Sequence, residues 1–570
     1  MMLLGINEDL FDSGVALCDG PRVVYAANEE RFTRRKNEGG FPRHSLEALF
    51  EQTGIAPRDI DRICVSGHMT PPLVVRLFPR LHDWIFEAKR DKGDTRISRL
   101  LDFAAFVTPI SRTSDRSPLR RIVRPLLAPV ARRTLPPSLR RVPIRFVEHH
   151  LAHAAGAWWT SGYEEALIIT ADGMGDGLSM TVSRAQAGAG IERLWAAAAM
   201  DSFGLFFEAL ASAMGFMACR DEGKITGLAA GGDPARVNEP APFVLEEGRL
   251  RYVGPHGARA VRWLRDNLCA RHAREDVAAW AQAALEEGIL AVARWWLRKT
   301  RQRRLAVAGG VFANVKLNQR LHELDDCETL FVYPNMGDGG LGLGAVCAEQ
   351  RFTPEPLRNV FLGDAYDDAT LERALRHSGL AYVRCENIES RIAELLAQGR
   401  IVARFRDRME WGPRALGNRS ILAPTTDRAL VERLNISLAR SDFMPFAPAM
   451  LDEDADEYVV GAQAARHAAE FMTVCFDCTP RMQREHPAVV HLDGTARAQF
   501  VREEANPAFH RILREFKRLT GSGVLLNTSF NIHEEPIVRT PEEAVAAFKK
   551  ARLDCLAMGD FLVAPDAGCP

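Results

Sequence analysis

The sequence predicts an α/β protein of two domains, and three observations support this. Apolar strands that end in Asp-Gly turns occur near the N-terminus and again around residue 172, and helix and strand patterns alternate over residues 362–570. The length of 570 residues allows two to four domains of about 150 residues each. With 47% hydrophobic and 26% charged residues, the composition is globular and excludes a disordered, collagen-like or disulfide-dense chain.

An internal duplication is expected in the N-terminal part. MLLGIN, SGVALC and RVVYAAN predict three strands, and the Asp19-Gly20 turn closes a hairpin between the last two. ALIITADGMGDGLSMTVSRA repeats the order of strand, Asp-Gly turn and strand about 160 residues later. Two such units are typical of the two lobes of an actin-like or sugar-kinase-like ATPase. EDVAAWAQAALEEGILAVARWWLRKT predicts a long amphipathic helix with basic residues in its last turn.

The composition changes near RFTPEPLRN, where two prolines flank Glu355. We therefore place the boundary at 352–362, between a domain of residues 1–352 and a domain of residues 362–570. In the second domain, IVARF, FMTVCFD and GVLLNTSF predict strands. ALVERLNISLA, PAFHRILREFKRL and PEEAVAAFKKA predict helices. This domain is expected to be α/β or α+β.

The overall charge and the cysteine pattern exclude several classes of protein. The formal net charge is -1 and the pI is near 7.0, so no strong overall charge recruits nucleic acid or anionic lipid. The start MMLLGINEDLF is no secretory signal, and no apolar run approaches the roughly 18 residues of a membrane span. The 11 scattered cysteines predict reduced thiols and a cytoplasmic protein.

A basic stretch interrupts the N-terminal domain. Residues 89–145 contain about fifteen Lys or Arg and about four Asp or Glu. The simpler interpretation is a solvated helical insertion near residues 70–145. The alternative is a basic lid or docking surface for an anionic substrate or partner.

The motif EHHLAHAAGAWW places His149 and His153 at i and i+4, on one face of a helix, as two ligands of one metal require. His150 points elsewhere and is interpreted as structural. Asp172 and Asp338 stand in Asp-Gly turns, where small residues allow a metal or phosphate to approach. Two His and two Asp suit Fe(II), Mn(II) or Zn(II). Packing histidines and Asx turns are the alternative interpretation.

Three glycine-rich loops in the first domain favour a nucleotide site, because backbone N–H groups and helix N-termini bind phosphate. They are Lys224 with its neighbouring glycines, Gly309-Gly310, and Gly337 to Gly344. No loop is a Walker A motif or a complete dinucleotide fingerprint. Their number favours a split site between two lobes.

Polar side chains cluster at two places in the second domain. EWGPRALGNRSIL carries Arg414 and Arg419, whose guanidinium groups suit phosphate or carboxylate. LLNTSFNIHEEPIV carries Asn527, Ser529 and Asn531 just after a strand. Ordinary turn chemistry is the alternative for both. The CxxC of Cys475 and Cys478 lies in a predicted strand without a second pair, so we interpret it as two ordinary thiols.

Together these segments resemble the carbamoyltransferase family of natural-product biosynthesis, including antibiotic biosynthesis, of the NodU and tobramycin carbamoyltransferase type. The resemblance covers nearly the whole chain except the basic stretch. The motifs that carry it are NEERFTRRKNEGGFP, VEHHLAHAAGAWW, ITADGMGDG, GKITGLAAGG, VAGGVFANVKLN, YPNMGDGGLGLGA, MEWGPRALGNRSIL, FMPFAPAML and LLNTSFNIHEEPIV.

The resemblance implies an actin-like ATPase domain of two lobes, similar to the threonylcarbamoyl transferase of tRNA modification, followed by a YrdC-like domain. It implies that the second domain binds carbamoyl phosphate and releases carbamate. Carbamate and ATP then form carbamoyl-adenylate and pyrophosphate, and the first domain transfers the carbamoyl group to an acceptor. The implied metal is Fe(II) or another divalent ion, and a role for Mg²⁺ is left open.

The resemblance also implies roles for individual residues. The metal ligands would be His149, His153, Asp172 and Asp338. Lys36 would lie near the carbamoyl group, and Gly309, Gly310 and Asn314 would contact the nucleotide. Arg414, Arg497 and Ser529 would hold carbamoyl phosphate, a small dianion that needs opposite charge and hydrogen-bond donors.

Two positions depart from the family pattern. Phe11 stands where members carry a histidine base, while Asp12 keeps the neighbouring aspartate. General-base help is typically worth 10²–10⁴-fold, so its loss needs an explanation. Either Asp12 or a distant histidine serves as the base, or the acceptor is an amine, or the enzyme depends on a partner. The second departure is Ala439 at an expected lysine, for which Arg440 is the candidate substitute.

The expected function is carbamoylation of a hydroxyl or amine on a small natural product, by a protein with no membrane or nucleic-acid partner and a homodimer as the default assembly. Threonylcarbamoylation of tRNA is one alternative, although a neutral chain argues against it. A degenerate, non-catalytic partner subunit is the other, and Phe11 is the feature in its favour.

Overall fold

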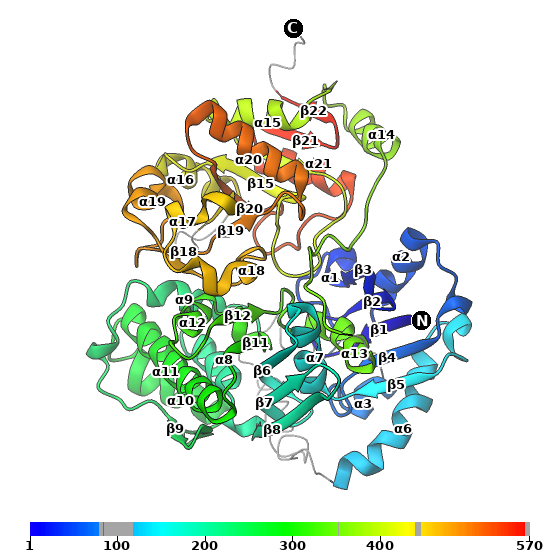
Figure 1. Cartoon of the computed structure of the whole chain (residues 1–570), viewed down its shortest axis with the longest axis vertical. Helices are drawn as coiled ribbons and strands as arrows, with labels where there is room; N and C mark the ends of the chain where they lie inside the picture. Colours follow the sequence, from blue (N-terminus) through cyan, green and yellow to red (C-terminus); the bar gives the residue numbers. More distant parts are fainter. Residues whose placement is uncertain (79–83, 85–117, 351–352, 439–445, 565–570) are drawn as a thin grey trace. The chain divides into compact units, whose positions relative to one another are not determined.

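The computed structural model describes residues 1–78, 84, 118–350, 353–438 and 446–564. It divides the chain into two compact units (Figure 1). The N-terminal unit comprises Met1–Glu29 and Asn37–Leu357, and the C-terminal unit comprises Glu30–Lys36 and Arg358–Pro570. The short segment Glu30–Lys36 thus lies with the C-terminal unit, an assignment that the sequence did not suggest.

Two five-stranded sheets of the same design form the N-terminal unit. In each, three antiparallel strands continue into two parallel ones. The first sheet has the order β3(Arg22–Asn28)-β2(Gly14–Asp19)-β1(Met2–Asn7)-β4(Arg62–Ser66)-β5(Ile144–Val147). The second has the order β8(Gly190–Ala198)-β7(Leu178–Gln186)-β6(Glu165–Gly175)-β11(Arg304–Ala308)-β12(Thr329–Val332). This duplicated order is that of the two-lobed actin-like ATPase fold, and it confirms the predicted fold class.

Two helices with many small residues pack against each other between these sheets (Figure 1). They are α7 (His149–Ser161), which contacts β6 and β11, and α13 (Leu341–Glu349), which contacts β1. A Cβ on Gly344 would lie 2.1 Å from the Ala152 carbonyl oxygen, and a Cβ on Gly5 would lie 2.0 Å from the Gly342 carbonyl oxygen. Glycine is therefore required at these crossings, and the close approach brings the N-termini of both helices to the sheet edges.

Further helices cover the second lobe. The predicted amphipathic helix is confirmed as α11 (Arg274–Thr300). It packs against α9 (Glu222–Ala229) and α12 (Val315–His322), while α8 (Phe203–Ala213) packs against α10 (Ala258–Leu264).

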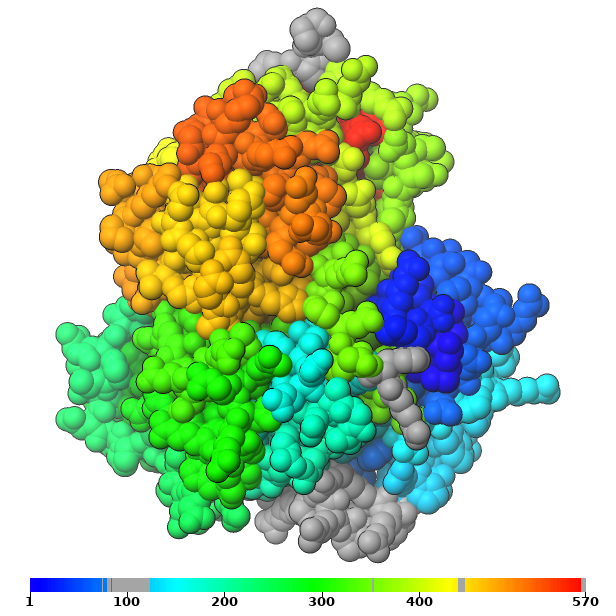
Figure 2. Space-filling view, in the orientation of Figure 1, coloured from blue at the N-terminus to red at the C-terminus, as the bar shows by residue number. Residues whose placement is uncertain are grey.

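The first lobe carries α2 (Arg43–Thr53), α3 (Leu73–Leu77) and α6 (Pro118–Thr134). The basic stretch is described only from residue 118 onward, where it forms α6 and the turn that follows it. Arg124 and Arg133 of α6 are exposed, and α6 forms part of the surface of this unit (Figure 2). Residues 85–117 lie outside the described part of the chain. Among the described residues, no helix combines the length and apolar character that crossing a membrane requires.

An eight-stranded mixed sheet forms the C-terminal unit. Helices α15 (Ile388–Ala397) and α20 (Pro507–Thr520) pack together over it, and their apolar faces share a core with Val402, Leu422 and Ala449. The strand order is β13(Val383–Arg384)-β22(Phe561–Val563)-β21(Cys555–Met558)-β14(Val402–Phe405)-β15(Arg419–Pro424)-β20(Val524–Ser529)-β16(Ala447–Leu451)-β19(Gln499–Val501). Helices α14 (Asp368–Ser378), α16 (Arg428–Ser437) and α21 (Pro541–Ala551) complete it.

Most predicted elements of this unit are present, but FMTVCFD is not a continuous strand. Only β17 (Phe476–Asp477) is extended, because Met472 has a φ of 55°, which a strand does not accommodate. Cys475 and Cys478 are both buried, and all ten described cysteines are free thiols.

The carboxylate of Asp176 ties the two lobes of the N-terminal unit together. It is fully buried and accepts hydrogen bonds from the backbone N–H groups of His68, Met69, Thr70 and His149. Its own N–H donates to Thr70 Oγ1 at 2.8 Å. Asp176 therefore joins the loop after β4 to the first residue of α7.

We expect Asp176→Ala to lower the Tm by about 6 °C or more, because each buried N–H left without an acceptor costs about 1–3 kcal/mol. Scanning calorimetry measures this. Asp19→Asn is the control, since the Asp19 side chain is 61% exposed. Equal Tm values for the two variants would contradict the proposed tie between the lobes.

Candidate functional site

Helix α7 places two fully buried imidazoles, His149 and His153, on one face. The helix begins there because the Glu148 side chain accepts the Leu151 N–H at 2.8 Å and so caps the first turn. Gly175 makes room for the first imidazole, since a Cβ at that position would lie 2.0 Å from His149 Cδ2.

Two carboxylates face these imidazoles. Asp172 lies in β6, and Asp338 begins the turn that leads into α13. Asp172 Oδ2 is 3.2 Å from His149 Nε2 and 3.1 Å from His153 Nε2, and Asp338 Oδ1 is 3.5 Å from both nitrogens. One ligand atom from each of the four residues lies within 4.8 Å of the others. The structure therefore brings the four predicted metal ligands together in one cluster.

The cluster is strongly coupled electrostatically. Burial alone would lower the pKa of His149, but Asp338, Asp172 and Asp9 outweigh it and hold this pKa well above 6.5. Burial raises the pKa of Asp338 to about 7, and the neighbouring Asp172 adds to the effect. Burial also acts to raise the pKa of Asp172, but hydrogen bonds from His149 and His153 hold it well below 3.8.

These four side chains fit a divalent metal. Within the described residues, Asp338 Oδ1 is buried and has no hydrogen-bond partner, although it faces both imidazoles. Two nitrogen and two oxygen ligands that converge on one point suit Fe(II), Mn(II) or Zn(II).

Asn7 was not predicted, and it holds the backbone beside this cluster. From the end of β1 its Nδ2 donates to the carbonyls of Asp338 at 2.8 Å and Asp12 at 3.1 Å, and its Oδ1 accepts from Ser66 Oγ. A buried Asn directly after a strand is the signal that would have identified it. Asp176, four residues after Asp172 in the same ADGMGDG motif, was also missed.

The predicted nucleotide residues separate into two groups. Gly309 has a φ of 108° and Gly310 lies next to Asp172 Oδ1, whereas Gly337 lies near the carboxylate of Asp12. A Cβ on Gly309 would lie 2.1 Å from the Ala171 carbonyl oxygen, so only glycine fits there. These three glycines line the region around the cluster.

Asn314 and Lys224 form the second group, because protein partners hold both. Asn314 caps α12 and hydrogen-bonds Thr226 of α9 and Gln282 of α11. Lys224 lies 3.0 Å from Asp221.

The two predicted catalytic residues lie in different units. Asp12 adopts a φ of 53°, and its Oδ1 accepts from Asn37 Nδ2 at 3.0 Å in the N-terminal unit. Lys36 is exposed on the segment that belongs to the C-terminal unit. Phe11 is half-buried.

In the C-terminal unit, Asn527 and Gln499 connect two strands to the loop that carries Arg414. Asn527 Nδ2 donates to Gln499 Oε1 at 2.7 Å and to the Ala415 carbonyl at 3.2 Å, and Gln499 Nε2 donates to the Leu416 carbonyl. Asn527 Oδ1 is buried without a partner among the described residues. Gln499 was not predicted.

Arg497 lies just before β19, and Ser529 is the last residue of β20. Arg497 stands two residues before Gln499, and burial lowers its pKa. Its buried Nε also has no partner among the described residues. Ser529 Oγ donates to Asn531 Oδ1 at 2.6 Å. A hydrogen-bond acceptor, Asn527 Oδ1, and a donor, Arg497 Nε, are therefore available to a small ligand.

Arg419 differs from the other predicted phosphate-binding residues. It is fully buried, and its terminal nitrogens donate to the backbone carbonyls of Arg406, Asn418, Asp364 and Asp407. This favours a structural role for Arg419. Arg440 lies outside the described residues.

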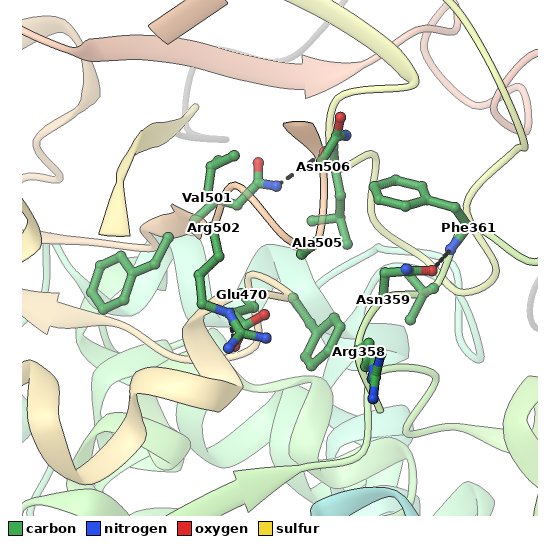
Figure 3. Close-up of a pocket in the computed structure, with 13 residues that line it drawn as sticks. Arg358, Asn359, Phe361, Glu470, Val501, Arg502, Ala505 and Asn506 are labelled. Carbon is green, nitrogen blue, oxygen red and sulfur yellow. Dashed lines mark hydrogen bonds and ion pairs between the residues drawn. The ribbon is translucent and has the colours of Figure 1, made fainter. Parts of the chain in front are cut away.

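A pocket opens beside the same network, lined among others by Leu416, Gln499 and Asn506. Figure 3 shows Arg502 beside Glu470 in this pocket, with Nε 3.0 Å from Glu470 Oε1. Burial raises the pKa of Glu470 to about 7, although Arg502 opposes the shift. No sequence motif had indicated this pocket.

Comparison with known proteins adds two family matches. The model described as carbamoyltransferase N-terminus matches residues 2–95 and 122–347, and the model described as carbamoyltransferase C-terminus matches residues 393–564. The gap in the first match falls within the basic stretch.

Individual relatives agree with these matches. Nodulation protein NolNO of Sinorhizobium fredii is 32% identical over 99% of this chain and 80% of its own length. The 3'-hydroxymethylcephem-O-carbamoyltransferase of Streptomyces clavuligerus is 30% identical over 60% of this chain and 64% of its own. Among solved structures, the activator of the 2-hydroxyisocaproyl-CoA dehydratase from Clostridium difficile, with bound ADPNP, matches at a TM-score of 0.33 and 15% identity, over 61% of this chain and 93% of its own.

We expect the wild-type chain to bind one divalent ion, and His149→Ala and Asp338→Asn each to weaken binding by about 100-fold or more, because each removes a ligand. Anaerobic equilibrium dialysis against Mn(II), followed by metal analysis, measures this. His377→Ala is the control, because His377 is exposed in the other unit. Undiminished binding in both ligand variants would exclude the cluster as the metal site.

We expect Glu470→Gln to raise the Tm by a few degrees at pH 8.5 and to leave it nearly unchanged at pH 4. The pKa of Glu470 rises from about 4.3 in an unfolded chain to about 7 in the folded protein. The stability that this group contributes is therefore full below about pH 4.3 and is lost as the pH rises through 7. The glutamine variant escapes that loss, which is worth about 1–2 kcal/mol after allowance for solvent near Arg502.

Calorimetry at the two pH values checks this expectation. Glu485→Gln is the control, because the Glu485 side chain is 35% exposed and Arg481 lowers its pKa. A gain in Tm that is the same at both pH values would show that the effect is not the titration of Glu470.

Proposed function

The chain belongs to the carbamoyltransferase family, and we propose that this transferase forms carbamoyl-adenylate from ATP and carbamoyl phosphate and carbamoylates a small natural product. The observation that carries the proposal is the cluster of two buried imidazoles, His149 and His153, and two partly buried carboxylates, Asp172 and Asp338, beside two glycines at positions 309 and 310. The proposed metal ligands lie next to a backbone segment whose close contacts allow only glycine. This combination suits a nucleotide phosphate.

The N-terminal unit is proposed to carry out adenylate formation. The two imidazoles and two carboxylates would hold Fe(II), which would act as a Lewis acid toward a phosphate oxygen. Asn7 holds the backbone of Asp338, and Asp176 holds the first residue of α7. These residues keep the ligands oriented before the nucleotide binds, so little reorganisation is needed during the reaction.

The C-terminal unit is proposed to hold carbamoyl phosphate. Arg414 and Arg497 would neutralise the dianion, and the Ser529 hydroxyl would donate to it. Water splits carbamoyl phosphate into carbamate and phosphate. The carbamate oxygen then attacks the α-phosphorus of ATP, pyrophosphate leaves, and carbamoyl-adenylate remains.

The acceptor attacks the carbamoyl carbon, AMP leaves, and the acceptor loses one proton. A relative named as an O-carbamoyltransferase favours a hydroxyl acceptor. Since Phe11 cannot take the proton, Asp12 is the first candidate base, and an amine acceptor would need less help. A non-catalytic partner subunit is the second candidate function, and Phe11 is the observation that favours it.

We expect the purified chain with Fe(II) to release pyrophosphate from ATP only when carbamoyl phosphate is present. Arg497→Gln should lower this rate by about 100-fold or more, because a buried cationic donor to the dianion is lost. A coupled pyrophosphate assay under anaerobic conditions measures both rates and needs no acceptor.

Two controls separate the sites. Arg484→Gln should keep the full rate, since this side chain is 68% exposed, and Arg497→Gln should still bind metal. If folded, metal-loaded protein releases no pyrophosphate, the non-catalytic partner subunit becomes the preferred function.

A further inference from the structure

Asp9 lies directly behind the metal-ligand candidate His149. Its Oδ2 is 3.5 Å from His149 Nδ1, while Nε2 of the same ring faces Asp172 and Asp338. The Asp9 side chain is 3% exposed and that of His149 is fully buried. The imidazole is therefore placed between a carboxylate on one side and the ligand cluster on the other.

The backbone fixes Asp9 in this position. Its Oδ1 accepts the Leu10 N–H at 2.6 Å, and its carbonyl accepts the Gly40 N–H at 2.8 Å. These contacts leave Oδ2 turned toward His149. Because Gly175 closes one face of the same ring and Asp176 holds the backbone N–H of His149, the ring has little freedom to turn away.

The neighbouring groups are not equivalent to Asp9. Glu8, the adjacent carboxylate, forms a buried ion pair with Arg76 at 2.7 Å and is already neutralised. Nδ1 of both His149 and His153 is buried and makes no hydrogen bond within the described part of the chain, but among those residues only His149 Nδ1 has a carboxylate within ion-pair distance. The carboxylate support is therefore specific to His149.

A metal-bound histidine uses one ring nitrogen for the ion, and a carboxylate on the other nitrogen fixes the tautomer and makes the ring a better ligand. We propose that Asp9 is a positioning residue that keeps the proton of His149 on Nδ1 and directs Nε2 to the metal. This inference rests on the proposed metal site of the N-terminal unit.

Asp9→Asn tests the inference, because it keeps the shape of the side chain and removes the charge. We expect the affinity for Co(II), titrated anaerobically by absorbance, to fall by about 10–100-fold and the d–d spectrum of the bound ion to change. Asp19→Asn, on the exposed end of β2, should bind Co(II) like the wild type. Asp9→Glu, which retains the charge, should recover much of the lost affinity.

A double-mutant comparison separates positioning from general structural damage. The effect of Asp9→Asn should disappear in a His149→Gln background and persist in a His153→Gln background. A loss of affinity that is equal in both backgrounds, or an Asp9→Glu variant as weak as Asp9→Asn, would overturn the inference.

The failure of this inference is distinguishable from the failure of the proposed function. If the wild type binds Co(II) and Asp9→Asn binds it within twofold, the role of Asp9 is wrong and the metal site stands. If the wild type binds no divalent ion, the metal site itself is wrong, and the role of Asp9 falls with it.

Discussion

The convergence of two buried imidazoles and two partly buried carboxylates at one point is the constraint on which the N-terminal unit depends. Charged groups lose their hydration in a protein interior and are tolerated only when opposite charges or hydrogen bonds replace it. Here two imidazoles and two carboxylates replace the lost hydration for one another, with nitrogen–oxygen distances of 3.1–3.5 Å. The arrangement requires α7, β6 and the turn before α13 to reach the same place. Glycines at positions 5, 175, 309 and 344 permit that approach, because a Cβ at any of them would overlap neighbouring atoms.

The C-terminal unit also buries charged side chains, of both signs. Arg404 and Arg419 are almost completely buried, and both donate to oxygens of uncharged groups. Burial lowers the pKa of each to about 10, so both remain charged at neutral pH. The buried carboxyl groups of Asp364 and Glu410 lie near Arg419 and oppose that lowering of its pKa. Arg419 therefore contributes to the fold of the unit, whereas Arg414 and Arg497 are the arginines proposed to hold the dianion.

The sequence predicted those parts of the site that depend on local pattern. Residues after strands in a duplicated fold meet at sheet edges, so Asp172, Asp338 and the histidines at i and i+4 could be brought together by topology alone. Residues that act through tertiary contacts gave no such signal. No motif singled out Asp9, and Arg419 looked like a ligand-binding arginine until its backbone carbonyl partners were known. FMTVCFD has the composition of a strand, but packing and the left-handed Met472 override that preference.

Phe11, at the position where the family resemblance implies a histidine, bears on the proposed acceptor step separately from the proposed metal site. The turn that carries Phe11 is retained, since Asp12 keeps its left-handed conformation and its hydrogen bond to Asn37. The side chain of Asn7 joins this turn to the loop of Asp338 by donating to both backbone carbonyls. Those contacts use backbone atoms and do not depend on the side chain at position 11. The turn therefore supports the loop of Asp338 whether or not it supplies a base, so the proposed adenylate chemistry does not depend on the side chain at position 11.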